Sequence, residues 1–201
     1  MVNPETYYRD AGGGKREWIN PPDVDVQRDE RGHVSGATLK ADGEPVHIGH
    51  VEKMAKSKNN GVDPQALIDR YGADTARFYT IFASPPTNTL EWSDESVEGS
   101  YRFLKRVWDF GYGFSKARRG AGVERKVRYQ IHLELKKAND DIERQKFNTV
   151  ASACMKILNA LEAQEEWDAT TEEGLSILLR LLSPIAPHIT HHLWRELEFG
   201  E

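Results

Sequence analysis

The chain is poor in cysteine and in long apolar stretches, and Cys154 is the single cysteine among its 201 residues. One cysteine excludes an intramolecular disulfide and a multi-cysteine metal cage. No apolar run approaches the roughly 18 residues of a membrane-spanning helix, and residues 1–4 lack the basic and apolar regions of a secretory signal. These absences predict a cytoplasmic protein that does not contact a membrane, and no residue pattern predicts a bound metal.

The chain also lacks an overall positive charge. Its net charge of −5 argues, for the chain taken whole, against a nucleic-acid partner. The charge is unevenly distributed, however, because residues 101–146 hold 13 Lys and Arg against 6 Asp and Glu, a net charge of +7. Two interpretations follow from this pattern: a surface for a polyanion, or a solvated helix face whose charges pair with acidic neighbours.

The first 50 residues have the pattern of strands and turns. Val24 and Val26 alternate with polar residues, which is the period-two pattern of a half-buried strand. A module of about 50 residues with so few apolar positions has a thin core and is marginal if it folds alone. The other predicted features are a flexible break at 12–14, a turn at 29–32, strands at 33–39 and 46–48, and a loop at 53–61.

The rest of the chain has the pattern of amphipathic helices. Asp63 and Pro64 are typical of a helix start, and Gly72 is typical of a helix end. Further helices are predicted at 74–83, 127–143, 171–182 and 188–197. Another is predicted to begin at 93 or 94 and to end in a region loosened by glycines at 111, 113, 120 and 122. A last one is predicted to begin at 148 or 149. The fold class is therefore mainly α: an antiparallel helical bundle preceded by a small β-rich module and a loop.

The predicted loop contains the sequence Lys53-Met54-Ala55-Lys56-Ser57, which resembles the KMSKS signature of class I aminoacyl-tRNA synthetases with Ala55 in place of the first serine. Two lysines on a mobile loop can neutralise the charge that develops on ATP phosphates during carboxylate attack. The alternative for these five residues alone is a solvated basic loop without a ligand.

A longer resemblance favours the first interpretation. The matching stretches are KSKNNGVDP at 56–64, DRYGADTAR at 69–77, LEW at 90–92 and RFLKRVW at 102–108, with DIER, FNT and PIAPH at 141–144, 147–149 and 184–188. Together these stretches resemble bacterial leucyl-tRNA synthetases over nearly the whole chain. Asn59-Asn60-Gly61 favours the leucyl branch, because isoleucyl and valyl relatives typically carry a Leu-Gly-Asn-type sequence there.

The resemblance implies a division into three parts and a function. Residues 1–50 correspond to a leucine-specific β-rich insertion, 51–92 to the KMSKS loop and the following helices, and 93–201 to an anticodon-binding-type bundle. The implied enzyme is a monomeric leucine–tRNA ligase that uses ATP with magnesium, leucine and tRNA-Leu. This chain is expected to be an inactive piece of that enzyme without a bound cofactor, lacking the Rossmann strands and the editing domain.

The resemblance also implies roles for individual residues. Lys56 contacts ATP, Lys53 and Ser57 support it as catalytic loop residues, and Met54 belongs to the same ATP site. The candidate contacts to tRNA phosphates are Arg102, Lys105, Arg106, Arg118 and Arg119, with Lys116 beside them. The competing hypotheses are a free-standing tRNA-binding module without catalytic duty and a purely structural helical domain.

Other patterns are predicted to be structural. His47-Ile48-Gly49-His50 spells the second class I signature, HIGH, but only two residues separate it from Lys53, so it is interpreted as a chance match at the end of a strand. His188, His191 and His192 lack an acidic third ligand at metal-binding spacing and are interpreted as packing residues. The predicted core residues are Trp92, Trp108, Trp194 and Cys154.

Overall fold

The computed structural model describes residues 1–31, 33–85, 87–116, 120, 122–164 and 166–200. The chain divides into two compact units. The first comprises Met1–Pro64 with Thr89–Trp92, and the second comprises Gln65–Asn88 with Ser93–Glu201. Residues 51–92, which the sequence groups as one part, contribute to both units, so the three-part division stays a prediction.

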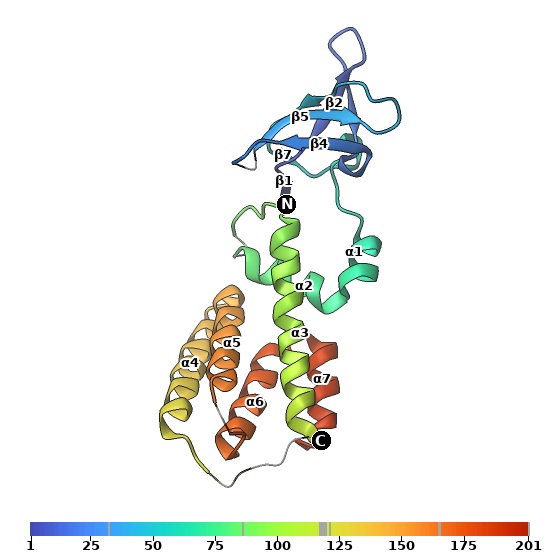
Figure 1. Cartoon of the computed structure of the whole chain (residues 1–201). Helices are drawn as coiled ribbons and strands as arrows, with labels where there is room; N and C mark the ends of the chain where they lie inside the picture. Colours follow the sequence, from blue (N-terminus) through green and yellow to red (C-terminus); the bar gives the residue numbers. More distant parts are fainter. Residues whose placement is uncertain (32, 86, 117–119, 121, 165, 201) are drawn as a thin grey trace. The chain divides into compact units, whose positions relative to one another are not determined.

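The first unit consists of short antiparallel strands (Figure 1). They form a three-stranded sheet in the order β3-β2-β6, a β4-β5 hairpin and a β1-β7 pair. The strands are β1 (Val2–Asn3), β2 (Tyr7–Asp10), β3 (Arg16–Ile19), β4 (Val24–Arg28), β5 (Val34–Leu39), β6 (His47–Ile48) and β7 (Glu52–Lys53). Short 3-10 turns lie at Pro21–Asp23 and Lys56–Lys58.

The hairpin predicted around Val24 and Val26 is confirmed by the pairing of β4 with β5. Val24 lies opposite Leu39 and Val26 opposite Ala37, and these side chains contribute to the small core of the unit. The carboxylate of Asp29 accepts hydrogen bonds from the backbone N–H groups of Arg31 and His33, which stabilises the chain reversal. Gly32, at the end of the predicted turn, lies outside the described residues.

The three glycines at 12–14 close a second hairpin, between β2 and β3, rather than simply breaking the chain. All three adopt positive φ angles, which residues with a side chain rarely adopt. The Ala11 N–H donates a hydrogen bond to the Lys15 carbonyl across the turn. The sequence did not predict these two strands because their apolar and charged residues come in adjacent pairs and do not alternate.

The described part of the second unit contains seven α-helices. They are α1 (Pro64–Tyr71), α2 (Ala73–Ala83), α3 (Asp94–Lys116), α4 (Arg125–Glu143), α5 (Phe147–Glu162), α6 (Ala169–Leu182) and α7 (Pro187–Glu196). Side chains from α2 to α7 share one hydrophobic core, and Figure 1 shows α4 and α5 lying side by side. The mainly α fold class is therefore confirmed.

Two predictions about α3 need correction. Gly111 and Gly113 were expected to loosen the chain, but both lie inside α3, which continues to Lys116. A Cβ at Gly111 would lie 3.0 Å from Leu193 of α7, and a Cβ at Gly113 would lie 2.9 Å from Trp167. The glycines therefore allow neighbouring side chains to pack closely on α3 without interrupting the helix.

The predicted core residues are buried or half-buried. Trp92 and Cys154 are buried, while Trp108 and Trp194 are half-buried and pack against the core of the second unit. Burial raises the pKa of the Cys154 thiol to about 12, which keeps it protonated and unreactive. Within the described ranges, no helix has the length and apolar composition required to cross a membrane.

Candidate lysine loop and helical-bundle cations

The candidate catalytic loop begins where β7 ends. β7 pairs with β1, so that Lys53 lies opposite Val2, and the Met54 N–H donates a hydrogen bond to the Met1 carbonyl at 3.2 Å. This pairing ties the first two loop residues to a strand. The Met54 side chain is half-buried.

Asn60 holds the other end of the loop and is completely buried. Its amide oxygen accepts a hydrogen bond from the Ala55 N–H at 2.9 Å, and its amide nitrogen donates to the Lys53 carbonyl at 3.3 Å. Its backbone carbonyl accepts a hydrogen bond from the Asn3 side chain at 3.0 Å. These hydrogen bonds fix both ends of the segment from 53 to 60. Breaking them would leave a buried amide without partners, which is costly in free energy.

Between these ends the chain makes a 3-10 turn over Lys56–Lys58. Ala55 occupies the N-cap position, where a serine hydroxyl could accept a backbone hydrogen bond and where alanine cannot. Asn59 ends the turn in the left-handed region with φ of 46°, and its side chain donates to the Trp18 carbonyl at 3.0 Å. The missing first serine is thus compatible with an ordered turn.

The structure separates the three lysines of the loop into two kinds. Lys58 forms an ion pair with Glu52, and its ammonium lies 5.4 Å from the centre of the Trp18 ring. The hydrogen bond from Lys58 lowers the pKa of Glu52. Lys53 and Lys56 are exposed, as is Ser57, and neither lysine has an ion-pair partner among the residues that the structure describes. Two cations are therefore available for an anionic ligand, and the third stabilises the loop.

The HIGH-like sequence forms part of a sheet. His47 and Ile48 form β6, which pairs with β2, and the His47 ring stacks on Tyr8 at 5.2 Å. The Gly49 N–H donates to the Thr6 carbonyl at 2.7 Å, and a Cβ at this glycine would collide with the Thr6 hydroxyl at 2.4 Å. These contacts agree with the interpretation of a strand end.

The candidate tRNA contacts on α3 are exposed but already have acidic neighbours. Arg102 lies 3.6 Å from Glu98, and Lys105 lies 2.6 Å from Asp109. Arg106 pairs with Glu162 of α5 and donates a hydrogen bond to Asn159 at 2.7 Å. Their role in binding tRNA stays a prediction, and a phosphate would have to compete with these carboxylates. The candidates Arg118 and Arg119 lie outside the described residues, and Lys116 donates to the Tyr112 hydroxyl.

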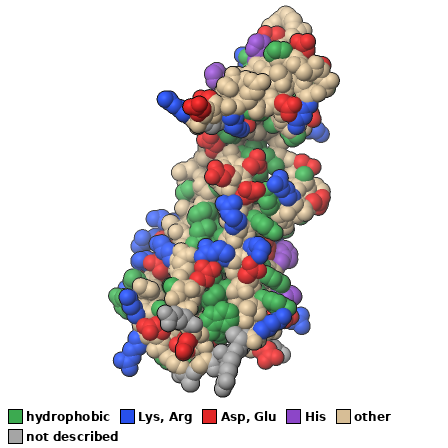
Figure 2. All heavy atoms as spheres, viewed as in Figure 1, with side chains coloured by type: hydrophobic (Ala, Val, Ile, Leu, Met, Phe, Trp, Pro, Cys, Tyr) green, Lys and Arg blue, Asp and Glu red, His purple; other side chains and the backbone are tan. Residues whose placement is uncertain are grey.

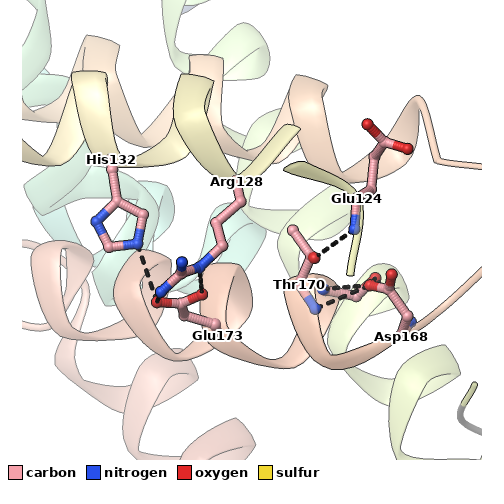
Figure 3. Close-up of polar contacts among 7 residues, drawn as sticks. Glu124, Arg128, His132, Asp168, Thr170 and Glu173 are labelled. Carbon is pink, nitrogen blue, oxygen red and sulfur yellow. Dashed lines mark hydrogen bonds and ion pairs between the residues drawn. The ribbon is translucent and has the colours of Figure 1, made fainter. Parts of the chain in front are cut away.

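The basic residues of α4 differ in their contacts: Lys137 pairs with Glu134, and Figure 3 shows two others that contact Glu173 of α6. Arg128 and His132 both contact Glu173 of α6, at 2.6 and 2.9 Å, and these bonds lower the pKa of Glu173 to about 2. Arg125, Lys126 and Lys136 are exposed and have no ion-pair partner within the described ranges.

Asp74 connects two segments that the sequence placed far apart. It is buried on α2, and its carboxylate accepts hydrogen bonds from the Ile189 N–H and from Nδ1 of His188, both at 2.8 Å. The first turn of α7 therefore receives its cap from another helix, because Ala186 at the N-cap provides none. His192 packs on Trp108 at 4.9 Å. Among the described residues, no group of three His, Cys, Asp or Glu is arranged to hold a metal.

Sequence reasoning did not identify Asn60 or Asp74 as anchoring residues. Asn60 lies in a segment that otherwise has the composition of a solvated loop, and the asparagine before a glycine was its only signal. Asp74 has the ordinary position of an acidic residue in the first turn of a helix. Neither pattern shows a partner that lies 57 or 115 residues away.

Two stretches of this chain match models of known protein families. Residues 124–201 match the family model of the anticodon-binding domain of tRNA ligase, and residues 46–93 match that of class I tRNA synthetases (I, L, M and V).

Among curated relatives, the leucine–tRNA ligase of Ralstonia nicotianae is 58% identical over 211 residues, which cover 100% of this chain and 24% of the relative. That of Aromatoleum aromaticum is 57% identical, covering 99% of this chain and 25% of the relative. The chain thus spans about a quarter of the length of these relatives.

Among solved structures, the chain is similar to the Agrobacterium radiobacter K84 agnB2 LeuRS in a ternary complex with tRNA and LeuAMS. The identity is 27% and the TM-score is 0.62, covering 72% of this chain and 21% of that one.

Proposed function

Since the chain belongs to the leucyl-tRNA synthetase family, we propose that it works as part of a leucine–tRNA ligase, which activates leucine with ATP and transfers it to tRNA-Leu. The observation that carries the proposal is the pair of exposed lysines, Lys53 and Lys56, which have no ion-pair partner in the described part of the chain and lie on a loop that the buried Asn60 anchors. Residues 1–50, 51–92 and 93–201 are assigned to the leucine-specific insertion, the lysine loop with its following helices, and the tRNA-binding bundle.

The proposed chemistry explains why the loop needs cations. The leucine carboxylate attacks the α-phosphate of ATP, which enters with magnesium as substrate, and the bond to pyrophosphate breaks as leucyl-adenylate forms. Negative charge develops on the phosphate oxygens during this step. The Lys56 ammonium, a compact cation with three hydrogen-bond donors, neutralises that charge. Lys53, Met54 and Ser57 belong to the same site, with Lys53 supplying the second cation.

The anchoring by Asn60 suits this role. A loop that must present two lysines to phosphates has a smaller loss of conformational entropy when its ends are already fixed. Lys56 and Ser57, in the middle of the loop, are exposed, so this part of the turn can adjust to its substrate while β7 and Asn60 stay in place. The carboxylate of Glu52 pairs with Lys58 and leaves the other two lysines available.

The proposal is tested in a chimaera in which this chain replaces the matching segment of the Ralstonia nicotianae ligase. We expect the chimaera to catalyse leucine-dependent exchange between ATP and pyrophosphate. Lys56→Ala should slow this exchange by about a hundredfold or more, because one charge-stabilising donor is lost.

Lys15→Ala removes an exposed lysine from the β2–β3 turn and serves as the control, with unchanged exchange expected. Near-normal exchange by Lys56→Ala, or no exchange by the unmodified chimaera, would contradict the proposal.

A further inference from the structure

Helix α4 has an exposed face that combines cations with large apolar side chains. We define the outer face of α4 by Arg125, Lys126, Tyr129, Leu133 and Lys136, which recur at three- and four-residue spacing. Tyr129 is 69% exposed and Leu133 40% exposed, whereas Ile131 and Ala138 on the opposite side are buried. Figure 2 shows Lys and Arg together with hydrophobic side chains along the edge of the second unit that α4 forms.

The pairing of charges distinguishes this face from the rest of the basic stretch. On the edge of α4 that meets α6, Arg128 forms an ion pair with Glu173, and the His132 ring contacts the same carboxylate (Figure 3). On α3, each of the three candidate cations lies beside a carboxylate. In the described part of the chain, the three cations of the outer face have no such partner, although Asp140 lies one turn beyond Lys136.

The spacing of these cations fits a polyanion. Lys136 lies ten positions after Lys126, which corresponds to about 15 Å along the helix axis. A nucleic-acid strand presents a charge about every 3.4 Å along its helix axis, so both lysines can contact phosphates of one strand. The exposed ring of Tyr129 lies between them in the sequence, and aromatic rings stack on unpaired bases without regard to their identity.

We propose that the outer face of α4 is an RNA-binding surface, on which Arg125, Lys126 and Lys136 bind backbone phosphates and Tyr129 packs on an unpaired base. This inference rests on the proposed function, because it takes tRNA as the RNA. It adds α4 to the predicted phosphate contacts and gives it a larger part than Arg102, Lys105 and Arg106 of α3, whose charges already have acidic neighbours.

The test is a fluorescence-anisotropy titration of tRNA-Leu and of an unrelated tRNA with the 201-residue chain at several salt concentrations. Lys126→Ala/Lys136→Ala should weaken binding at least about tenfold near 0.1 M salt and lower the slope of log affinity against log salt by about two. Because phosphates carry no sequence information, the loss should be equal for both tRNAs. Lys15→Ala/Lys40→Ala removes the same charge from the first unit and should leave both quantities unchanged.

Tyr129 is tested separately. Tyr129→Ala should weaken binding roughly fivefold or more without changing the salt slope, and Tyr129→Phe should restore it because the ring is kept. Binding that Tyr129→Ala leaves unchanged overturns the base contact.

Three outcomes distinguish a failure of this surface from a failure of the proposed function. If the unmodified chain binds tRNA and the α4 variants bind it equally well, the surface is refuted and tRNA binding stands. Variants that keep their RNA affinity but change the sedimentation coefficient would show that the face packs against a second protein copy, which also refutes it. If the unmodified chain binds no tRNA at low salt, both the α4 surface and the tRNA-binding part of the proposed function are refuted. The role of the lysine loop is then still tested separately by ATP–pyrophosphate exchange.

Discussion

At the scale of single residues, two buried polar side chains hold segments that carry the family motifs. Asn60 joins Asn3, Lys53 and Ala55 in the first unit. In the second unit, Asp74 joins α2 to the start of α7. Each of these side chains has its hydrogen bonds satisfied, and this matters because an unsatisfied buried polar group costs about 1–3 kcal/mol. Motif residues in this chain therefore include structural anchors as well as candidate ligand contacts.

The anchoring role of Asp74 leads to a stability prediction. Asp74→Ala removes the acceptor for the Ile189 N–H and for His188, and we expect it to lower the free energy of unfolding by about 1–3 kcal/mol. Urea unfolding followed by circular dichroism measures the change. Asp69→Ala on the exposed side of α1 is the control and should stay within about 0.5 kcal/mol of the unmodified chain. Equal stability of the two variants would contradict the capping role.

The residues of the lysine loop could be found from the sequence, but their division into two kinds could not. Lys53, Lys56 and Lys58 have the same side chain within six positions, and the sequence does not show that Glu52 and Trp18 engage Lys58 alone. Such selection depends on where β3 and β7 place their side chains. Pairing between residues far apart in the chain is decided by tertiary structure, and local spacing carries little information about it.

At the scale of elements, local signals located the helices well. Asp63 with Pro64 marks the start of α1, and Ser93 accepts a hydrogen bond from the Ser96 N–H at the start of α3. Other starts differ from prediction by one or two residues, as at α6, where Asp168 forms a capping box with Thr171. The end of α3 was misjudged because the low helix propensity of glycine was weighed without its packing. The interior contacts of Gly111 and Gly113 outweigh that propensity.

The same competition between propensity and packing gives a paired prediction for two helical glycines. A Cβ at Gly174 of α6 would lie 2.6 Å from Leu161 and 2.7 Å from Ile131, whereas a Cβ at Gly99 of α3 would meet nothing closer than Arg102 at 3.8 Å. Gly174→Ala should therefore destabilise the chain by about 1–3 kcal/mol through overpacking. Gly99→Ala should stabilise it by up to about 1 kcal/mol through helix propensity.

Urea unfolding compares both variants with the unmodified chain. Each change adds one methyl group to a helix, so the two variants are matched in chemistry and differ in surroundings. A stabilising Gly174→Ala would show that α4, α5 and α6 do not pack as closely as the structure describes.

At the scale of the whole molecule, the average charge and the local charge predict different partners. The net −5 argues against RNA, yet residues 101–146 carry a net +7. The interpretation of paired, solvated charges describes Arg102, Lys105 and Arg106 of α3, each of which lies beside a carboxylate. The polyanion interpretation stays a prediction for the outer face of α4, whose cations have no ion-pair partner among the described residues. Local spacing could have indicated the pairs of Arg102 with Glu98 and of Lys105 with Asp109, but not those of Arg106 and Arg128, since their partners Glu162 and Glu173 come from later helices.

The two compact units differ greatly in how much apolar surface they bury. The hydrophobic cluster of the first unit consists of Tyr7, Val24, Ala37 and Val46 with three partly buried neighbours. The second unit has one larger cluster, to which α2 to α7 all contribute side chains. Since hydrophobic burial is the main source of stability, a small core opens at a lower free energy than a large one.

We therefore expect the first unit to lose its hydrogen-exchange protection first. In hydrogen exchange followed by mass spectrometry at increasing urea below the main transition, peptides from β4 and β5 should exchange before peptides from α5 and α6. Peptides from α1, which has no buried residue, give the fast-exchange reference. Equal protection of the β4–β5 hairpin and α5 at every urea concentration would mean that the thin core does not limit the stability of the first unit. In that case the first unit would be stabilised by more than the four side chains of its hydrophobic cluster, and the source of that stability would lie outside the cluster.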